Sequence, residues 1–147
     1  MAQGTTNLVH RDTGDGSILI WPWAYSSVTA GTWVFGISSA YNYYGFLQNS
    51  GTANDQIDYK VWLSKGYWNV ALATPAHASM GIISLLLDST VEASLEPVSS
   101  GSIISGFKRD IYVSTTGLHT ISLKVTIGGT SGTSYCYVQY ILLTRAN

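Results

Sequence analysis

Apolar and polar residues alternate with a period of two along much of this chain. Residues 55–63 (DQIDYKVWL) place four apolar side chains on one side of an extended strand: Ile57, Tyr59, Val61 and Leu63. The other side carries Asp58, Lys60 and Trp62. Successive side chains of a strand point to opposite faces, so this period indicates a strand with one buried face. No stretch shows the i, i+3, i+4, i+7 spacing of an amphipathic helix.

Similar segments recur along the chain, separated by Gly, Ser, Thr, Asn and Asp. We predict strands at 17–21, 33–38, 43–48, 55–63, 67–73, 81–87, 91–95, 107–113, 117–127 and 135–143. About nine or ten short strands at this spacing favour an all-β fold, a single antiparallel β-sandwich of jelly-roll type over residues 17–147. We expect 55–63 and 67–73 to form a hairpin around Lys65-Gly66, and 135–143 to be another hairpin partner.

Residues 1–16 are polar and rich in glycine, and they show no strand pattern. They form either an extended arm that docks on a neighbour or a loose terminus. The segment also lacks the charged and apolar regions of a signal peptide, which predicts synthesis in a cytoplasm.

The composition of the 147 residues favours contacts with other chains. Only 10% of the residues are charged, against about 25% in a typical soluble domain, while 46% are apolar. A surface with so little charge indicates areas that become buried against partners. The Lys and Arg residues are scattered and the net charge is −1, which argues against nucleic-acid binding. No stretch approaches 18 uninterrupted apolar residues, so we expect no membrane span.

Candidate chemistry is weak, and we predict no catalytic residue, no metal site, no cofactor and no enzyme activity. Asp12 and Asp15 fit a tight turn better than a calcium loop. His119 shares the apolar side of its strand, where a hydrogen-bonded structural histidine is more common than a base. Cys136 lies within a strand pattern and is expected to be buried. No GxSxG, P-loop or dinucleotide-binding motif is present.

Aromatic residues crowd into residues 21–46. They could fill the core, cover a subunit interface or stack on sugar rings, because Tyr and Trp serve all three roles. At least one tyrosine of YNYY (41–44) must leave the core, since consecutive strand residues face opposite sides. The candidates for an interface or glycan surface are Trp21, Trp23, Tyr25, Tyr41, Tyr43 and Tyr44.

Two stretches resemble a known group of domains: residues 43–96, with KGYW and LLLDST, and residues 115–144 (TTGLHTISLKVTIGGTSGTSYCYVQYILLT). They are similar to the β-sandwich domains of phage tail-fibre tips and of phage capsid decoration (cement) proteins, although Asp88-Ser89 stands where Asp-Gly is usual. The resemblance implies a homotrimeric virion protein that binds the major capsid protein or other virion proteins and stabilises the shell. It also implies that the N-terminal arm contacts the shell or a neighbouring subunit, through Asn7, Leu8, Val9, His10 and Arg11. The alternative is a tail-fibre or receptor-binding head, or a carbohydrate-binding module, with a host-surface glycan as partner.

Overall fold

The computed structural model describes residues 8–12, 14–38, 43–98 and 103–146. Within these residues all regular structure is β-strand. The strands are β1 (Val9–His10), β2 (Ser17–Ile20), β3 (Ser27–Ala30), β4 (Trp33–Ser38), β5 (Tyr43–Asn49), β6 (Gln56–Leu63), β7 (Gly66–Ala76), β8 (Ile82–Leu87), β9 (Thr90–Leu95), β10 (Ile103–Val113), β11 (Gly117–Thr126), β12 (Tyr137–Val138) and β13 (Tyr140–Arg145). In the described part of the chain, no helix has the length and apolar character needed to cross a membrane.

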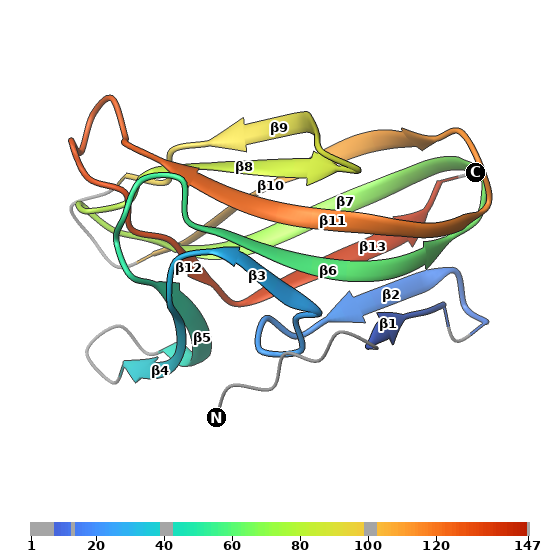
Figure 1. The fold of residues 1–147 in the computed structure, drawn as a ribbon, viewed down its shortest axis with the longest axis horizontal. Helices are drawn as coiled ribbons and strands as arrows, with labels where there is room; N and C mark the ends of the chain where they lie inside the picture. Colours follow the sequence, from blue (N-terminus) through green and yellow to red (C-terminus); the bar gives the residue numbers. More distant parts are fainter. Residues whose placement is uncertain (1–7, 13, 39–42, 99–102, 147) are drawn as a thin grey trace.

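The strands form two large sheets and a smaller one. A six-stranded sheet has the order β1-β6-β11-β8-β9, with β3 also paired to β6. A four-stranded sheet has the order β10-β7-β13-β2, and β12-β5-β4 make the small sheet. The long strands of both large sheets run along the longest axis of the molecule (Figure 1). The predicted antiparallel β-sandwich is confirmed.

The core lies between the sheets and is built by the alternation seen in the sequence. On β6 the apolar side chains Ile57, Tyr59, Val61 and Leu63 are fully buried. On β7 the side chains of Trp68, Val70 and Leu72 join the same core cluster from the other sheet. Each strand thus buries one face, and its other face is left for the surface.

Both expected hairpins are wrong. Strands β6 and β7 belong to different sheets, and the chain crosses between them at Ser64-Lys65. The Trp68 indole Nε1 donates a hydrogen bond of 2.9 Å to the Ser64 carbonyl and closes this corner. The last predicted strand is divided into β12, which pairs with β5, and β13, which pairs with β7 and β2. Alternation identifies the buried face of a strand, but it does not identify the sheet to which that strand belongs.

Candidate functional site

A polar groove crosses the outer face of the six-stranded sheet. Its volume is about 570 Å³. It is lined by hydroxyl, amide, carboxylate and ammonium side chains: Ser27, Thr29, Gln56, Asp58, Lys60, Asp88, Ser89, Thr120 and Ser122. We call this surface the sheet groove.

Strand pairing brings these side chains together. Ser122 of β11 lies opposite Asp58 of β6, and Ser27 of β3 lies opposite Asp58 on its other side. One step along the same face, Thr120 lies opposite Lys60. Because the neighbouring residues on β6 point into the core, these residues must point outward. The floor of the groove therefore spans three adjacent strands.

Asp58 is the most enclosed group of the groove, with only 6% of its surface exposed. Its Oδ1 accepts hydrogen bonds from Ser122 Oγ at 2.5 Å and Gln56 Nε2 at 2.9 Å. Its Oδ2 accepts from Thr29 Oγ1 and, at 3.4 Å, from Ser27 Oγ. A carboxylate held by four donors fixes the orientation of its neighbours and is poorly placed to act as a base.

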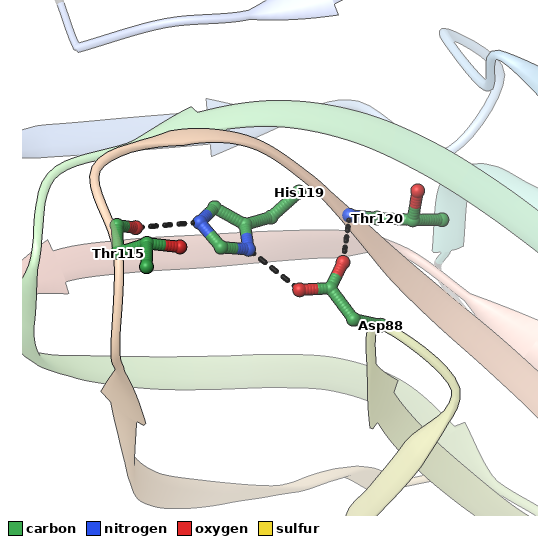
Figure 2. A network of polar contacts seen from close by, with 4 residues as sticks. All are labelled: Asp88, Thr115, His119 and Thr120. Atoms are coloured by element: carbon green, nitrogen blue, oxygen red, sulfur yellow. Dashed lines mark hydrogen bonds and ion pairs between the residues drawn. The ribbon is translucent and has the colours of Figure 1, made fainter.

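A second carboxylate, Asp88, is held at the edge of the groove by His119 (Figure 2). Asp88 Oδ2 lies 2.6 Å from His119 Nδ1, and Asp88 Oδ1 accepts the Thr120 backbone N–H at 2.9 Å. His119 Nε2 lies 2.8 Å from the Thr115 carbonyl oxygen. Both ring nitrogens thus face acceptors, an arrangement that a protonated imidazole satisfies. Burial opposes the charge, but these two acceptors outweigh it and raise the pKa of His119.

Trp62 continues the outer face of β6 beyond Lys60. Its side chain is 43% exposed and lies opposite Leu118 of β11. The guanidinium carbon of Arg11 lies 5.0 Å from the centre of the Trp62 ring. A smaller pocket of about 250 Å³ is lined by Arg11, Asp12, Trp62, Ser64 and Trp68. An exposed indole therefore lies on the same sheet face as the groove.

The groove contains the donors and acceptors needed to hold a polar ligand by hydrogen bonds. No cluster of three or more His, Cys, Asp or Glu side chains that could hold a metal is found among the described residues. The Cys136 thiol is fully buried, and burial raises its pKa, so it stays protonated. Asp12 accepts the backbone N–H groups of Gly14 and Gly16, as in the turn that the sequence predicts.

The predicted N-terminal contact residues lie beside β6. Val9 and His10 form β1, which pairs in parallel with Lys60 and Val61. Leu8 accepts a hydrogen bond at its carbonyl from Ser26 Oγ, and Arg11 covers Trp62. Asn7 lies outside the described residues. Contact of this segment with another chain stays a prediction.

The predicted aromatic residues fall into different environments. Trp21 is exposed, Trp23 is half-buried and Tyr25 belongs to the core. Tyr41 lies outside the described residues. For Tyr43 and Tyr44 only the backbone is described, as part of β5. The structure thus brings Trp21 and Trp23 together and separates them from Tyr25.

The sequence reasoning did not identify the sheet groove as a site. It placed Asp58 and Lys60 on the polar side of one strand. It placed His119 on the apolar side of another, which leaves Thr120 and Ser122 on the opposite, polar side. The signal in the sequence that could have indicated the groove was a run of polar residues at successive outward positions of two strands. The contribution of β3 could not be found in this way, because SVTA is too short and too polar for a clear period.

Comparison with known proteins finds similarity in structure only. No protein-family model and no curated protein matches the sequence. The CBM36-1 domain of a multidomain xylanase from the hindgut metagenome of Trinervitermes trinervoides is similar in structure, with a TM-score of 0.67 and 16% identity over 89% of this chain and 98% of that one. The carbohydrate-binding module CBM6cm-2 of Cellvibrio mixtus lichenase 5A, solved with cellotriose, has a TM-score of 0.64 and 13% identity over 88% and 97%. The chain shares the β-sandwich fold of these modules.

The same fold also occurs inside larger proteins. The insecticidal crystal protein CRY2AA matches with a TM-score of 0.70 and 17% identity, over 92% of this chain and 22% of that one. At such identities the likeness shows the fold alone, so function has to be argued from the site.

Proposed function

We propose that this protein binds carbohydrate non-covalently and that the sheet groove holds a section of a glycan chain. The observation that carries the proposal is the groove itself, in which hydroxyl, amide and charged side chains from three strands converge on one open channel of about 570 Å³. Sugar hydroxyl groups both donate and accept hydrogen bonds, and this lining offers both kinds of partner.

The similarity in fold supports this proposal, because two of the similar structures are named as carbohydrate-binding modules and one was solved with cellotriose. The site adds its own support. The floor of the groove is fixed by the Asp58 hydrogen bonds, so little side-chain freedom is lost on binding. Trp62 offers an aromatic surface on the same face. Among the described residues of the groove, both carboxylates are engaged in hydrogen bonds, Asp58 with Ser122 and Asp88 with His119, which supports binding over cleavage.

Native affinity electrophoresis in gels that contain xylan, mannan, mixed-linkage β-glucan or hydroxyethyl cellulose tests the proposal. We expect at least one of these polysaccharides to retard the protein. Lys60→Ala should remove most of the retardation, because Lys60 lines the groove. Lys65→Ala is the matched control, since it removes the same charge from an exposed turn outside the groove.

Unchanged migration of the wild-type protein in all four gels would contradict the proposal. An equal loss of retardation in Lys60→Ala and Lys65→Ala would also contradict it, because that result would indicate a general charge effect.

A second candidate is the assembly role that the phage resemblance implies, as a homotrimeric decoration protein or a fibre head. One observation favours it: the outer face of the four-stranded sheet exposes large apolar side chains, namely Leu19, Tyr67, Tyr112 and Tyr140. Such faces are typical of surfaces covered by another chain. Size-exclusion chromatography with light scattering should then give the mass of a trimer for the wild type. The double variant Tyr67→Ser, Tyr112→Ser should give a lower mass. A wild-type monomer at all concentrations would argue against assembly.

A further inference from the structure

A second aromatic surface lies away from the sheet groove, at the turn that follows β2. The indoles of Trp21 and Trp23 are stacked, with ring centres 5.6 Å apart and planes only 6° from parallel. Trp23 in turn packs edge-on against Phe35 of β4, at 5.2 Å and 89°. None of these three residues lines the groove. We call this surface the indole stack.

The turn that carries the indole stack is held by three hydrogen bonds. The Ala24 backbone N–H donates to the Trp21 carbonyl at 3.0 Å and closes a four-residue turn with Pro22 in its second position. The buried Tyr59 hydroxyl donates to the Pro22 carbonyl at 2.7 Å. His10 Nε2 lies 2.8 Å from the Ala24 carbonyl oxygen. The backbone that carries the two indoles is therefore fixed before any ligand arrives.

Trp21 leaves a broad flat surface open. Trp21 is 48% exposed although its ring system stacks on Trp23. With parallel planes and ring centres 5.6 Å apart the two indoles are offset, so Trp23 covers only part of Trp21 and the rest of its ring system lies in solvent. Such a rigid exposed indole can stack on an apolar ring face without losing side-chain freedom.

We infer that the indole stack is a second carbohydrate-contact site, where the outer face of Trp21 takes a single pyranose ring with equatorial hydroxyl groups. Such a ring presents its axial C–H groups as a flat apolar face that matches an indole. This inference rests on the proposed function, because both sites take sugar. Two separate sites would let one molecule hold a polysaccharide at two points, which raises the overall affinity by avidity.

Nuclear magnetic resonance tests the two sites separately. Methyl β-glucoside and methyl β-xyloside are titrated into ¹⁵N-labelled protein while the Trp21 indole N–H and the Gln56 side-chain amide signals are followed. We expect the Trp21 signal to shift and saturate. Trp21→Ala should also lower the affinity for the polysaccharide that retards the wild-type protein by at least tenfold. Tyr112→Ala, which removes an aromatic ring of the same 48% exposure from β10, should leave that affinity unchanged.

The outcomes separate the two proposals. A shift of Gln56 without a shift of Trp21 overturns the indole site and supports the groove. A shift of Trp21 without a shift of Gln56 supports the indole site and overturns the groove, and no shift at either signal overturns both. A Trp21 signal that moves with protein concentration in the absence of sugar would show that a second copy covers the stack, which also overturns the inference.

Discussion

Single residues set the shape of the Asp88-Ser89 turn at the edge of the sheet groove. Both residues have positive φ, 46° and 73°. Two-residue hairpin turns with this backbone prefer glycine or asparagine, because a Cβ atom makes the left-handed region costly. Asp88 compensates by accepting hydrogen bonds from His119 and Thr120. Among the described residues, no hydrogen bond of Ser89 is found that would offset the strain of its positive φ.

Replacing Ser89 by glycine should therefore stabilise the protein. The left-handed conformation costs roughly 1–2 kcal/mol for a residue with a Cβ, and the greater freedom of glycine in the unfolded chain cancels part of the gain. We expect Ser89→Gly to raise the free energy of unfolding in urea by about 0.5–1 kcal/mol. Ser114→Gly is the control, since Ser114 is exposed and lacks a positive φ, and it should lower stability. A loss of stability in both variants would show that the turn is unstrained.

His119 should make stability depend on pH. Its pKa is raised in the folded state because Asp88 and the Thr115 carbonyl outweigh the effect of burial. The folded protein therefore binds the proton more tightly than the unfolded chain, whose histidine pKa is about 6.5. This contribution is fully present below pH 6.5 and is lost as the pH rises through the folded-state pKa.

We expect the free energy of unfolding of the wild type to fall, relative to that of His119→Gln, as the pH rises from about 6.5 through the folded-state pKa of His119. Urea unfolding of both proteins at a series of pH values measures this difference. The pKa of His10 is lowered, mainly by burial, so His10 contributes with the opposite sign in both proteins. The difference between wild type and variant therefore isolates His119. Parallel pH profiles would show that the His119 pKa is not raised.

At the scale of strands, Asp58 joins β3, β6 and β11 through one carboxylate. It accepts hydrogen bonds from Ser27 and Thr29 of β3, Gln56 of β6 and Ser122 of β11. Asp58→Ala would leave these donors without their shared acceptor, so we expect a loss of about 1–3 kcal/mol in thermal or urea unfolding. Asp110→Ala, at an exposed position on β10, should change stability by less than about 0.5 kcal/mol. Equal losses of stability in Asp58→Ala and Asp110→Ala would mean that water replaces Asp58 as the acceptor for the four donors at no cost in free energy.

Most strands and their buried faces were predictable from the sequence, β1 and β3 being exceptions, whereas the partners of the strands were not. The alternation over residues 55–63 identified the core side of β6 correctly, because burial of one face is a local pattern. The pairing of β6 with β11 and β3 joins segments far apart in the sequence, and no local signal contains that information. The groove depends on this pairing, so Asp58 and Lys60 were placed on the polar side of their strand but their neighbours on β3 and β11 were not identified. The indole stack was closer to a prediction, since only Pro22 separates Trp21 from Trp23 in the chain.

For the whole molecule, the chain repeatedly crosses between the two large sheets. β6 lies in the six-stranded sheet, β7 in the four-stranded sheet, β8 and β9 in the former again, and β10 in the latter. Each crossing adds a strand to the opposite side of one shared core. Trp68, which is 1% exposed, enters this core directly after the first of these crossings. The inner faces of these strands thus build the core, while the outer face of the six-stranded sheet carries the groove for which we propose glycan binding.

A pair of tryptophan variants tests this division. Trp68→Ala should lower the free energy of unfolding by about 3–5 kcal/mol, because it leaves a cavity in the core and removes the indole hydrogen bond to Ser64. Trp62→Ala, six residues earlier in the chain on the outer face of β6, should cost less than about 1.5 kcal/mol, because Trp62 is already 43% exposed. Urea unfolding gives both values, and affinity electrophoresis gives the effect on glycan binding. We expect Trp62→Ala to weaken polysaccharide retardation while the protein stays folded. If Trp62→Ala destabilises the sandwich as much as Trp68→Ala does, the outer face of β6 is part of the folding core and the division does not hold.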